Sequence, residues 1–163
     1  MSKAFTRESD DSGDDEVASI RPPLPPGTTN YITPEGAENL QQRLNELLQK
    51  KERFSGSPNG TEPDLKKLEA NIRILQQTLN SVVVAQPAPN SDKVAFGSTV
   101  RIRHQNGEDE DFRIVGVDEA DPENNSISWL SPLARALLSR KVGETVRFRT
   151  PVGLEELTLL SIG

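Results

Sequence analysis

The stretch from Ile127 to Gly153 reads ISWLSPLARALLSRKVGETVRFRTPVG and decides the fold of the C-terminal half of the chain. Ser131 is a good helix N-cap, and Pro132 stands at the first helical position, where its missing N–H costs nothing. The residues that follow predict a helix of about two to three turns that stops at Gly143. Alternating residues over 145–149 and the turn Thr150-Pro151-Val152-Gly153, followed by 154–162, then predict two paired strands. We therefore expect a short helix that lies between strands of one small sheet.

Three more strands are expected upstream of this helix. Apolar and basic residues alternate over 100–103, and Asn106-Gly107 is a strong hairpin turn. Residues 112–117 supply the return strand, and Ile127 with Trp129 adds another. The order strand, strand, strand, helix, strand, strand predicts a twisted antiparallel β-sheet with one short helix packed on it.

Two heptad stripes predict a pair of long helices in the N-terminal half. The first helix should begin at Thr33-Pro34, an N-cap threonine followed by a proline. Residues 53–63 are rich in Gly, Pro and Asn-Gly turn signals, which cannot continue a helix. The two helices, each of about 19 to 22 residues, should pair as an antiparallel coiled-coil hairpin that extends on the order of 30 Å. The stripes comprise Ala37, Leu40, Leu44, Leu47 and Leu48 in the first helix and Leu65, Leu68, Ile72, Leu75, Leu79 and Val82 in the second.

Both halves of the chain carry motifs that resemble the Gre family of bacterial transcription elongation factors. The family's C-terminal signature is a Ser-Pro-Leu/Met-Ala/Gly-Arg-Ala-Leu run, then Val-Gly-Asp/Glu, then Thr-Pro-Gly-Gly. It is matched here from Ser131 to Gly153, with Val152 in place of one glycine. The segments YITPEG (31–36), FGSTVRI (96–102) and FRIVGVDEAD (112–121) extend the likeness. The resemblance implies an α+β fold in which a coiled-coil hairpin precedes an FKBP-like sheet domain.

The chain is expected to divide into four segments. Residues 1–29 form an acidic and Pro-rich tail, 30–86 the coiled-coil hairpin with its turn at 53–63, 87–95 a linker, and 96–163 the FKBP-like domain. The run ESDDSGDDE at 8–16 contains six of the 25 acidic residues. Such a run is typical of a solvated, disordered tail rather than of a metal or partner site.

Composition limits the classes of partner. The net charge of −6 argues against sequence-independent binding to nucleic acid, so any link to DNA or RNA should be indirect. Because the chain has no cysteine, it can form neither a disulfide nor a thiolate metal site. No apolar run approaches the roughly 18 residues of a transmembrane helix, and no signal-peptide core is present. We expect a cytoplasmic monomer that does not engage a membrane.

The Gre resemblance implies that the partner is bacterial RNA polymerase and that the coiled coil enters its secondary channel. In the family, an Asp-x-x-Glu-Asn pattern at the tip of the coiled coil helps to hold the second catalytic Mg²⁺ and its attacking water. That pattern is missing here, since Asp64-Leu65-Lys66-Lys67 has a lysine where the second carboxylate would be, and the arm is shorter. The remaining candidates for catalytic or metal-holding acids are Glu62 and Asp64. Their alternative role is structural, because acids complement the dipole at a helix start and Asp64 could cap the helix.

The resemblance also implies a polymerase-binding edge at Ser131, Pro132 and Leu133. Arg135, exposed one turn later, could steer the protein toward an acidic surface. The alternative interpretation is structural, since the same residues cap and start a helix, and both roles are compatible.

Other classes of function have less support in the sequence. A peptidyl-prolyl isomerase of this fold needs a deep aromatic pocket, and five Phe, one Tyr and one Trp supply it poorly. Trp129 is therefore expected to pack or to anchor a partner. His104, the only histidine, is expected on a solvent-edge strand with no acid or metal-ligand partner, and Glu108 to Asp111 should form a charged loop flank. No phosphate-binding glycine loop is present.

The sequence thus predicts a non-enzymatic regulator that binds RNA polymerase and does not stimulate transcript cleavage efficiently. It needs no cofactor of its own. The rival hypothesis is an active cleavage factor in which Glu62 and Asp64, or acids of the N-terminal tail, help to hold a polymerase Mg²⁺. The tail is the poorer source, because fixing it would cost conformational entropy for every ordered residue.

Overall fold

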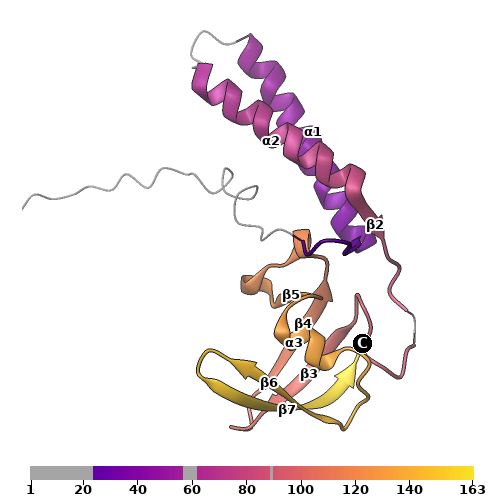
Figure 1. Cartoon of the computed structure of the whole chain (residues 1–163). Coiled ribbons are helices and arrows are strands. Elements are labelled where there is room, and N and C mark those ends of the chain that lie inside the picture. The colour runs from indigo at the N-terminus through magenta and orange to yellow at the C-terminus, as the bar shows by residue number, and fades with distance from the viewer. Residues whose placement is uncertain (1–23, 57–61, 89) are drawn as a thin grey trace, which may run out of the picture.

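A computed structural model describes residues 24–56, 62–88 and 90–163 of the chain. A helical hairpin, α1 (Pro34–Ser55) and α2 (Glu62–Ser81), projects from one end of a β-sheet domain (Figure 1). We call the hairpin the arm and residues 93–163 the sheet domain. The predicted α+β class, with a helical hairpin followed by a sheet, is confirmed. The predicted tail, 1–29, lies mostly outside the described residues, and its disorder stays a prediction.

The arm helices begin and end close to the predicted positions. Thr33 caps α1, because its hydroxyl oxygen accepts a hydrogen bond from the Gly36 N–H at 3.0 Å. The first helix continues to Ser55 and the second begins at Glu62, so both extend into the range 53–63 that was predicted as turn. Phe54 packs against the arm core, which explains why α1 runs on. Residues 57–61 lie outside the described residues.

The apolar stripes of α1 and α2 bury one another, as the heptad spacing predicts. Leu48 is 37% exposed and lies outside the interface, and Ala37 and Leu65 of the predicted stripes are not part of the arm core either. Across the helices, Lys51 Nζ lies 3.3 Å from Glu69 Oε1, an exposed pair of small energetic weight. The arm core consists of Leu44, Leu68, Ile72 and Leu75, with Leu40, Leu47, Phe54 and Leu79 packed against it.

A small parallel sheet closes the base of the arm and was not predicted. Strand β1 (Asn30–Ile32) leads directly into α1, and β2 (Val82–Val84) follows directly from α2. The two strands pair in parallel, with Tyr31 opposite Val83. The prediction that Val82 extends the helical stripe is therefore wrong. Three consecutive β-branched valines favour a strand, and pairing with β1 secures it.

The sheet domain has five strands in the order β5-β4-β3-β7-β6. They run in the predicted sequence, with the single helix α3 between the third and fourth of them. Their bounds are β3 (Thr99–His104), β4 (Asp109–Val115), β5 (Ser126–Ser128), α3 (Pro132–Leu137), β6 (Thr145–Thr150) and β7 (Gly153–Ile162). The sheet is not wholly antiparallel as expected, because β5 pairs with β4 in parallel. The crossover between β4 and β5 runs through two short 3₁₀ helices, η1 (Val117–Glu119) and η2 (Pro122–Asn124), and the alternation of apolar residues in the strands gave no sign of it.

Helix α3 packs on one face of the sheet and is shorter than predicted (Figure 1). Ser131 caps it as expected, accepting a hydrogen bond from the Ala134 N–H at 3.2 Å. The helix stops at Leu137 rather than continuing toward Gly143. The chain leaves it because Ser139, in the left-handed region at φ 68°, donates its N–H to the Val94 carbonyl at 2.8 Å. The domain core comprises Val94, Val100, Ile102, Ile114, Ala134, Leu137, Val146, Leu157 and Leu159.

The opposite face of the sheet carries a ladder of ion pairs. Arg101 holds Asp111 through two hydrogen bonds of 2.7 and 3.0 Å, and Arg103 holds Asp109 in the same two-pronged geometry. The expectation that residues 108–111 form a loop flank is therefore wrong for Asp109 to Asp111, which belong to β4. Strand alternation places these acids opposite the arginines of β3.

We expect this ladder to make the stability of the sheet domain decrease in acid. The hydrogen bond from Arg103 lowers the pKa of Asp109, and that from Arg101 lowers the pKa of Asp111. A carboxylate with a lowered pKa in the folded state stabilises that state above its unfolded pKa of about 3.9. The contribution is lost as the pH falls through the lower folded value. Because the groups are exposed, the effect is small.

An NMR titration of the side-chain carboxyl carbons would measure both values. In Arg103→Gln, the pKa of Asp109 should rise toward its ordinary value while Asp111 stays low. If Asp109 titrated identically with and without Arg103, the paired geometry would not persist in solution.

Candidate functional site

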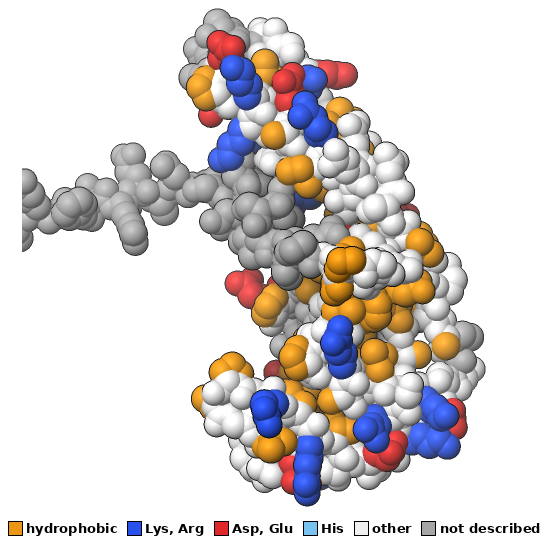
Figure 2. Space-filling model, in the orientation of Figure 1, with side chains coloured by type: hydrophobic (Ala, Val, Ile, Leu, Met, Phe, Trp, Pro, Cys, Tyr) orange, Lys and Arg blue, Asp and Glu red, His pale blue; other side chains and the backbone are white. Residues whose placement is uncertain are grey.

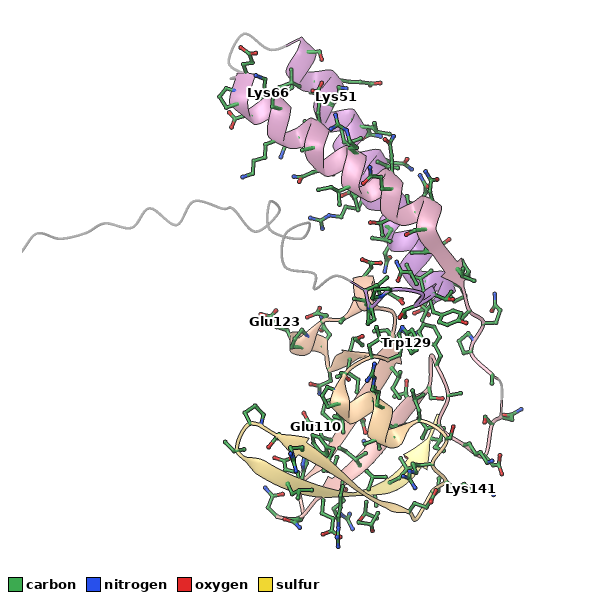
Figure 3. The ribbon with its side chains drawn as sticks, in the orientation of Figure 1. Lys51, Lys66, Glu110, Glu123, Trp129 and Lys141 are labelled. Carbon is green, nitrogen blue, oxygen red and sulfur yellow. The ribbon has the colours of Figure 1, made fainter. Side chains whose placement is uncertain are left out.

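The two acids proposed for the outer end of the arm lie in the first turn of α2. Helix α2 begins at Glu62, so Asp64 lies inside the helix and does not cap it, contrary to one expectation. Glu62 Oε1 lies 3.4 Å from Lys66 Nζ, four residues later on the same face. Figure 3 shows Lys66 and Lys51 close to this end of the arm. Both carboxylates complement the positive end of the helix dipole.

The surroundings of these acids are basic. Asp64 lines a small cavity of about 130 Å³ together with Lys50, Lys67 and Phe54. Among the residues that the structure describes, no group of three or more His, Asp or Glu side chains could hold a metal ion. The described part of this end therefore presents carboxylates that are offset by nearby ammonium groups.

The residues proposed for docking lie together on one turn of the sheet domain. Ser131 caps α3, Pro132 is exposed, and Leu133 packs partly against the domain core. Arg135 is exposed on the same short helix. Ser131 and Pro132 thus begin the helix, as the structural interpretation predicts. Pro132 and Arg135 are also exposed, so a partner could contact them.

His104 differs from its prediction in two respects. It lies at the end of β3, which has neighbours on both sides in the sheet, so the strand is not an edge strand. An acid also accompanies it, because the His104 Nε2 atom lies 2.9 Å from Glu110 Oε2. The pairing crosses the β3–β4 hairpin and is not visible as a sequence motif.

Trp129 packs at the junction between the arm and the sheet domain (Figure 3). The Tyr31 ring lies 5.5 Å from the Trp129 ring in a T-shaped contact and 6.0 Å from the Phe96 ring. Figure 2 shows hydrophobic side chains gathered where the two parts meet. These three rings attach β1 to the sheet domain. Of the two roles expected for Trp129, packing is the one that these contacts provide.

Glu119 joins the arm to the sheet domain and was missed by the sequence analysis. Its Oε2 atom accepts hydrogen bonds from the backbone N–H of Thr33 at 2.9 Å and of Gly116 at 2.8 Å. Its Oε1 atom accepts a hydrogen bond from the Thr33 hydroxyl. One carboxylate at the end of η1 therefore binds the N-cap residue of α1.

Two glycines make room for this carboxylate. A Cβ atom on Gly36 would overlap the Glu119 side chain, and one on Gly116 would overlap the Tyr31 carbonyl oxygen. The sequence held one signal of this arrangement. Glycine in a helix costs about 1 kcal/mol relative to alanine, so Gly36 in the first turn of α1 indicates a close contact there.

Two further polar contacts flank Glu119. Arg113 Nη1 lies 2.6 Å from Glu35 Oε2, and Asn30 Nδ2 donates to Asp118 Oδ2 at 2.9 Å. We call this set of residues the arm mount: Asn30, Thr33, Glu35 and Gly36 on the arm side, and Arg113, Gly116, Asp118 and Glu119 on the domain side. An open cleft of about 560 Å³ lies beside the mount, between α1 and the sheet domain.

Comparison with known proteins places this chain in a family. Transcription elongation factor GreB of Neisseria meningitidis serogroup B is 35% identical over 153 residues, covering 83% of this chain and 94% of that protein. This chain belongs to the GreA/GreB family. GreB of Pseudomonas aeruginosa is also 35% identical over 154 residues, covering 84% of this chain and 91% of its own. The family model "Transcription elongation factor, GreA/GreB, C-term" matches residues 88–163.

Solved structures of GreA/GreB relatives also match. The GreA factor homolog Gfh1 of Thermus thermophilus is 23% identical, covers 83% of this chain and 99% of its own, and gives a TM-score of 0.41. The two GreB relatives at 35% identity confirm the predicted membership in the Gre family of transcription elongation factors. The docking candidates Ser131 to Arg135 lie inside the part matched by the family model, whereas Glu62 and Asp64 lie outside it. Over the described residues, none of the helices combines the length and apolar character needed to span a membrane.

Proposed function

We propose that this GreA/GreB family protein is a non-enzymatic regulator of bacterial RNA polymerase in the cytoplasm. The sheet domain docks on the polymerase, and the arm enters the secondary channel without efficient stimulation of transcript cleavage. The observation that supports this proposal most is that a lysine neighbours each acid at the start of α2, since Lys66 pairs with Glu62 and Lys67 lines a cavity with Asp64.

The shape of the arm supports insertion into a channel. Helix α1 has 22 residues and α2 has 20, which corresponds to a rod about 30 Å long. The helices bury their apolar stripes against each other, so these stripes need no other part of the protein to shield them from water. A rod that completes its own core can project from the sheet domain and probe a narrow space.

The chemistry at the outer end of the arm argues against cleavage. A second Mg²⁺ requires hard oxygen ligands in near-octahedral geometry at about 2.1 Å. The ion pair of Glu62 with Lys66 is weak, because both groups are exposed, and would not by itself prevent metal binding. The nearby Lys66 and Lys67 ammonium groups disfavour a divalent cation by charge repulsion, and the described residues offer no third carboxylate that would complete a site. The residues present therefore do not fit a Mg²⁺ site, and we assign no cleavage step to them.

Docking is assigned to the edge of Ser131, Pro132 and Leu133, with Arg135 beside it. The exposed Pro132 ring and the half-buried Leu133 side chain offer apolar contact, and Arg135 adds a charge that favours an acidic partner surface. The partner contacted is the polymerase, so nucleic acid is approached only through the transcription complex. This agrees with the net charge of −6.

A transcript-cleavage assay on backtracked elongation complexes tests the proposal. Added to an active Gre cleavage factor, this protein should lower the cleavage rate several-fold as it is titrated in, and it should shorten no RNA alone. Arg135→Glu should weaken this competition, whereas Arg149→Glu, the same charge change at an exposed position of β6, serves as the control. RNA shortening by this protein alone would favour the rival role of Glu62 and Asp64. An unchanged rate at saturating protein would contradict docking.

A further inference from the structure

We propose that Glu119 is a positioning residue that sets the direction in which the arm leaves the sheet domain. The inference goes beyond docking and cleavage, because it concerns how the chain aims its own arm. It is argued from the arm mount, from the separation of the two hydrophobic cores and from the cleft beside them.

The two hydrophobic cores do not fix the direction of the arm. The arm core and the domain core are separate clusters that share no residue. A continuous core would hold two bodies in one orientation, because close-packed interiors resist deformation. Between separate cores, the direction of α1 depends on the contacts at its first turn.

The aromatic contacts at the junction hold β1, and β2, which continues α2, pairs with β1, but none of these contacts involves the first turn of α1. Tyr31 packs on Phe96 and Trp129 and so attaches the strand to the sheet domain. Thr33 lies between the end of β1 at Ile32 and the start of α1 at Pro34, and it caps the helix. A group that sets the direction of α1 relative to β1 acts most directly at Thr33, the residue between them.

Glu119 acts at this position. Its carboxylate accepts three hydrogen bonds, two from Thr33 and one from Gly116, and thereby joins the N-cap of α1 to the start of η1. The Thr33 oxygen in turn accepts the Gly36 N–H, so the connection continues into the first turn of the helix. Hydrogen bonds to an ionised acceptor are shorter and about twice as strong as neutral ones. The arrangement fixes both the position and the rotation of the first helical turn.

The flanking ion pair alone cannot do this. Glu35 is exposed and Arg113 is about one-third exposed, so their contact is screened by solvent. The open cleft between α1 and the sheet domain leaves the space into which a released arm could swing. Direction is thus held by a partly buried polar link rather than by packing on all sides.

Spin labels can measure the direction of the arm in the free protein. Because the chain has no cysteine, Glu52→Cys near the outer end of α1 and Val152→Cys in the β6–β7 turn give two specific sites. Both positions are exposed, Val152 by 92%. Pulsed electron spin resonance between the labels should give one narrow distance distribution. A broad distribution in the parent protein would overturn the proposal, because the arm would then have no fixed direction.

Two variants remove the link from opposite sides. Glu119→Ala deletes the carboxylate, and Gly36→Ala expels it, because the added methyl group would occupy its place. We expect both to broaden or shift the distribution. Gly36→Ala keeps the test valid if Glu119→Ala unfolds the domain, since alanine favours the helix that contains it. Glu123→Ala, an exposed acid in η2, and Glu38→Ala, exposed in the first turns of α1, are the matched controls and should change nothing.

A rescue distinguishes positioning from general destabilisation. Thr33→Ser keeps the hydroxyl and the backbone N–H and should retain the narrow distribution. Thr33→Val removes one of the three hydrogen bonds to Glu119 together with the cap bond from the Gly36 N–H, and should broaden it. Unchanged narrow distributions in both Glu119→Ala and Gly36→Ala, with far-ultraviolet circular dichroism showing folded protein, would contradict the role of Glu119.

The consequence for polymerase rests on the proposed function and is measured separately. Glu119→Ala should still bind polymerase through the sheet domain but compete several-fold less well with an active cleavage factor. If the parent protein did not compete with the active cleavage factor, the proposed function would be refuted and the distance result would still stand. Equal competition by the variant, with a broadened distribution, would show that direction is irrelevant to channel entry.

Discussion

Ile72→Ala should unfold the arm at temperatures at which the sheet domain is still folded. Ile72 is 6% exposed and belongs to the arm core between α1 and α2. Removing a buried isoleucine down to alanine costs about 3 kcal/mol, within a range of about 2 to 5. That is a large fraction of the stability available to a two-helix unit, which has no second layer to compensate. The domain core contains none of the residues affected.

Circular dichroism at 222 nm, followed with temperature, would detect this loss as an early transition of helical signal. Ile74→Ala is the matched control, because the same residue type on the same helix is 39% exposed. That variant should stay within about 0.5 kcal/mol of the parent protein. If Ile72→Ala instead lowered a single cooperative transition of the whole chain, the arm and the sheet domain would unfold as one unit.

Gly116→Ala should separate β1 from the sheet domain. The backbone of Gly116, at φ −68° and ψ 164°, suits any residue, so the effect is steric and not conformational. The added Cβ atom would overlap the backbone carbonyl oxygen of Tyr31, which cannot rotate away as a side chain does. Either β1 or η1 must move, and the Gly116 hydrogen bond to Glu119 is strained with it. We expect a cost of about 3 kcal/mol, at the upper end of typical overpacking effects.

Urea denaturation followed by Trp129 fluorescence would measure that cost, since the Trp129 ring contacts Tyr31 of β1. Gly56→Ala is the control, because its added Cβ atom would meet nothing nearer than 3.9 Å. A Gly116→Ala midpoint equal to that of Gly56→Ala would show that the close approach of η1 to β1 is absent in solution.

The parts of the fold that follow from local chemistry could be predicted. The caps at Thr33 and Ser131 and the turn at Asn106-Gly107 depend on residues within three or four positions of one another. The arm helices follow from a periodicity sustained over many residues, which is the strongest sequence signal available. The length of α3 could not be predicted, because Ser139 leaves the helix to bond Val94, 45 positions earlier in the numbering.

The parts of the fold that could not be predicted depend on contacts between segments distant in the sequence. The parallel pairing of β5 depends on the path through η1 and η2, where no periodic pattern exists. Val82 fits a heptad position and a β-branched run equally well, and only its pairing with β1 decides between them. Glu119 is 86 residues from Thr33, so its role had no local signature. The docking edge from Ser131 to Arg135 was predicted from the family resemblance and stays a prediction, whereas the arm mount is visible only in three dimensions.

The parallel pair β1 and β2 has a consequence for how such a protein can change over evolutionary time. Helix α1 starts at this pair of strands and α2 ends at it, so the hairpin is anchored to the sheet domain at its root. Inserting one heptad into each helix would extend the reach by about 10 Å without disturbing a single contact at the root. The length of the arm can therefore change without a change in the direction in which the arm leaves the sheet domain. Descendants of one ancestor could differ in how deeply they penetrate a partner while engaging it in the same way.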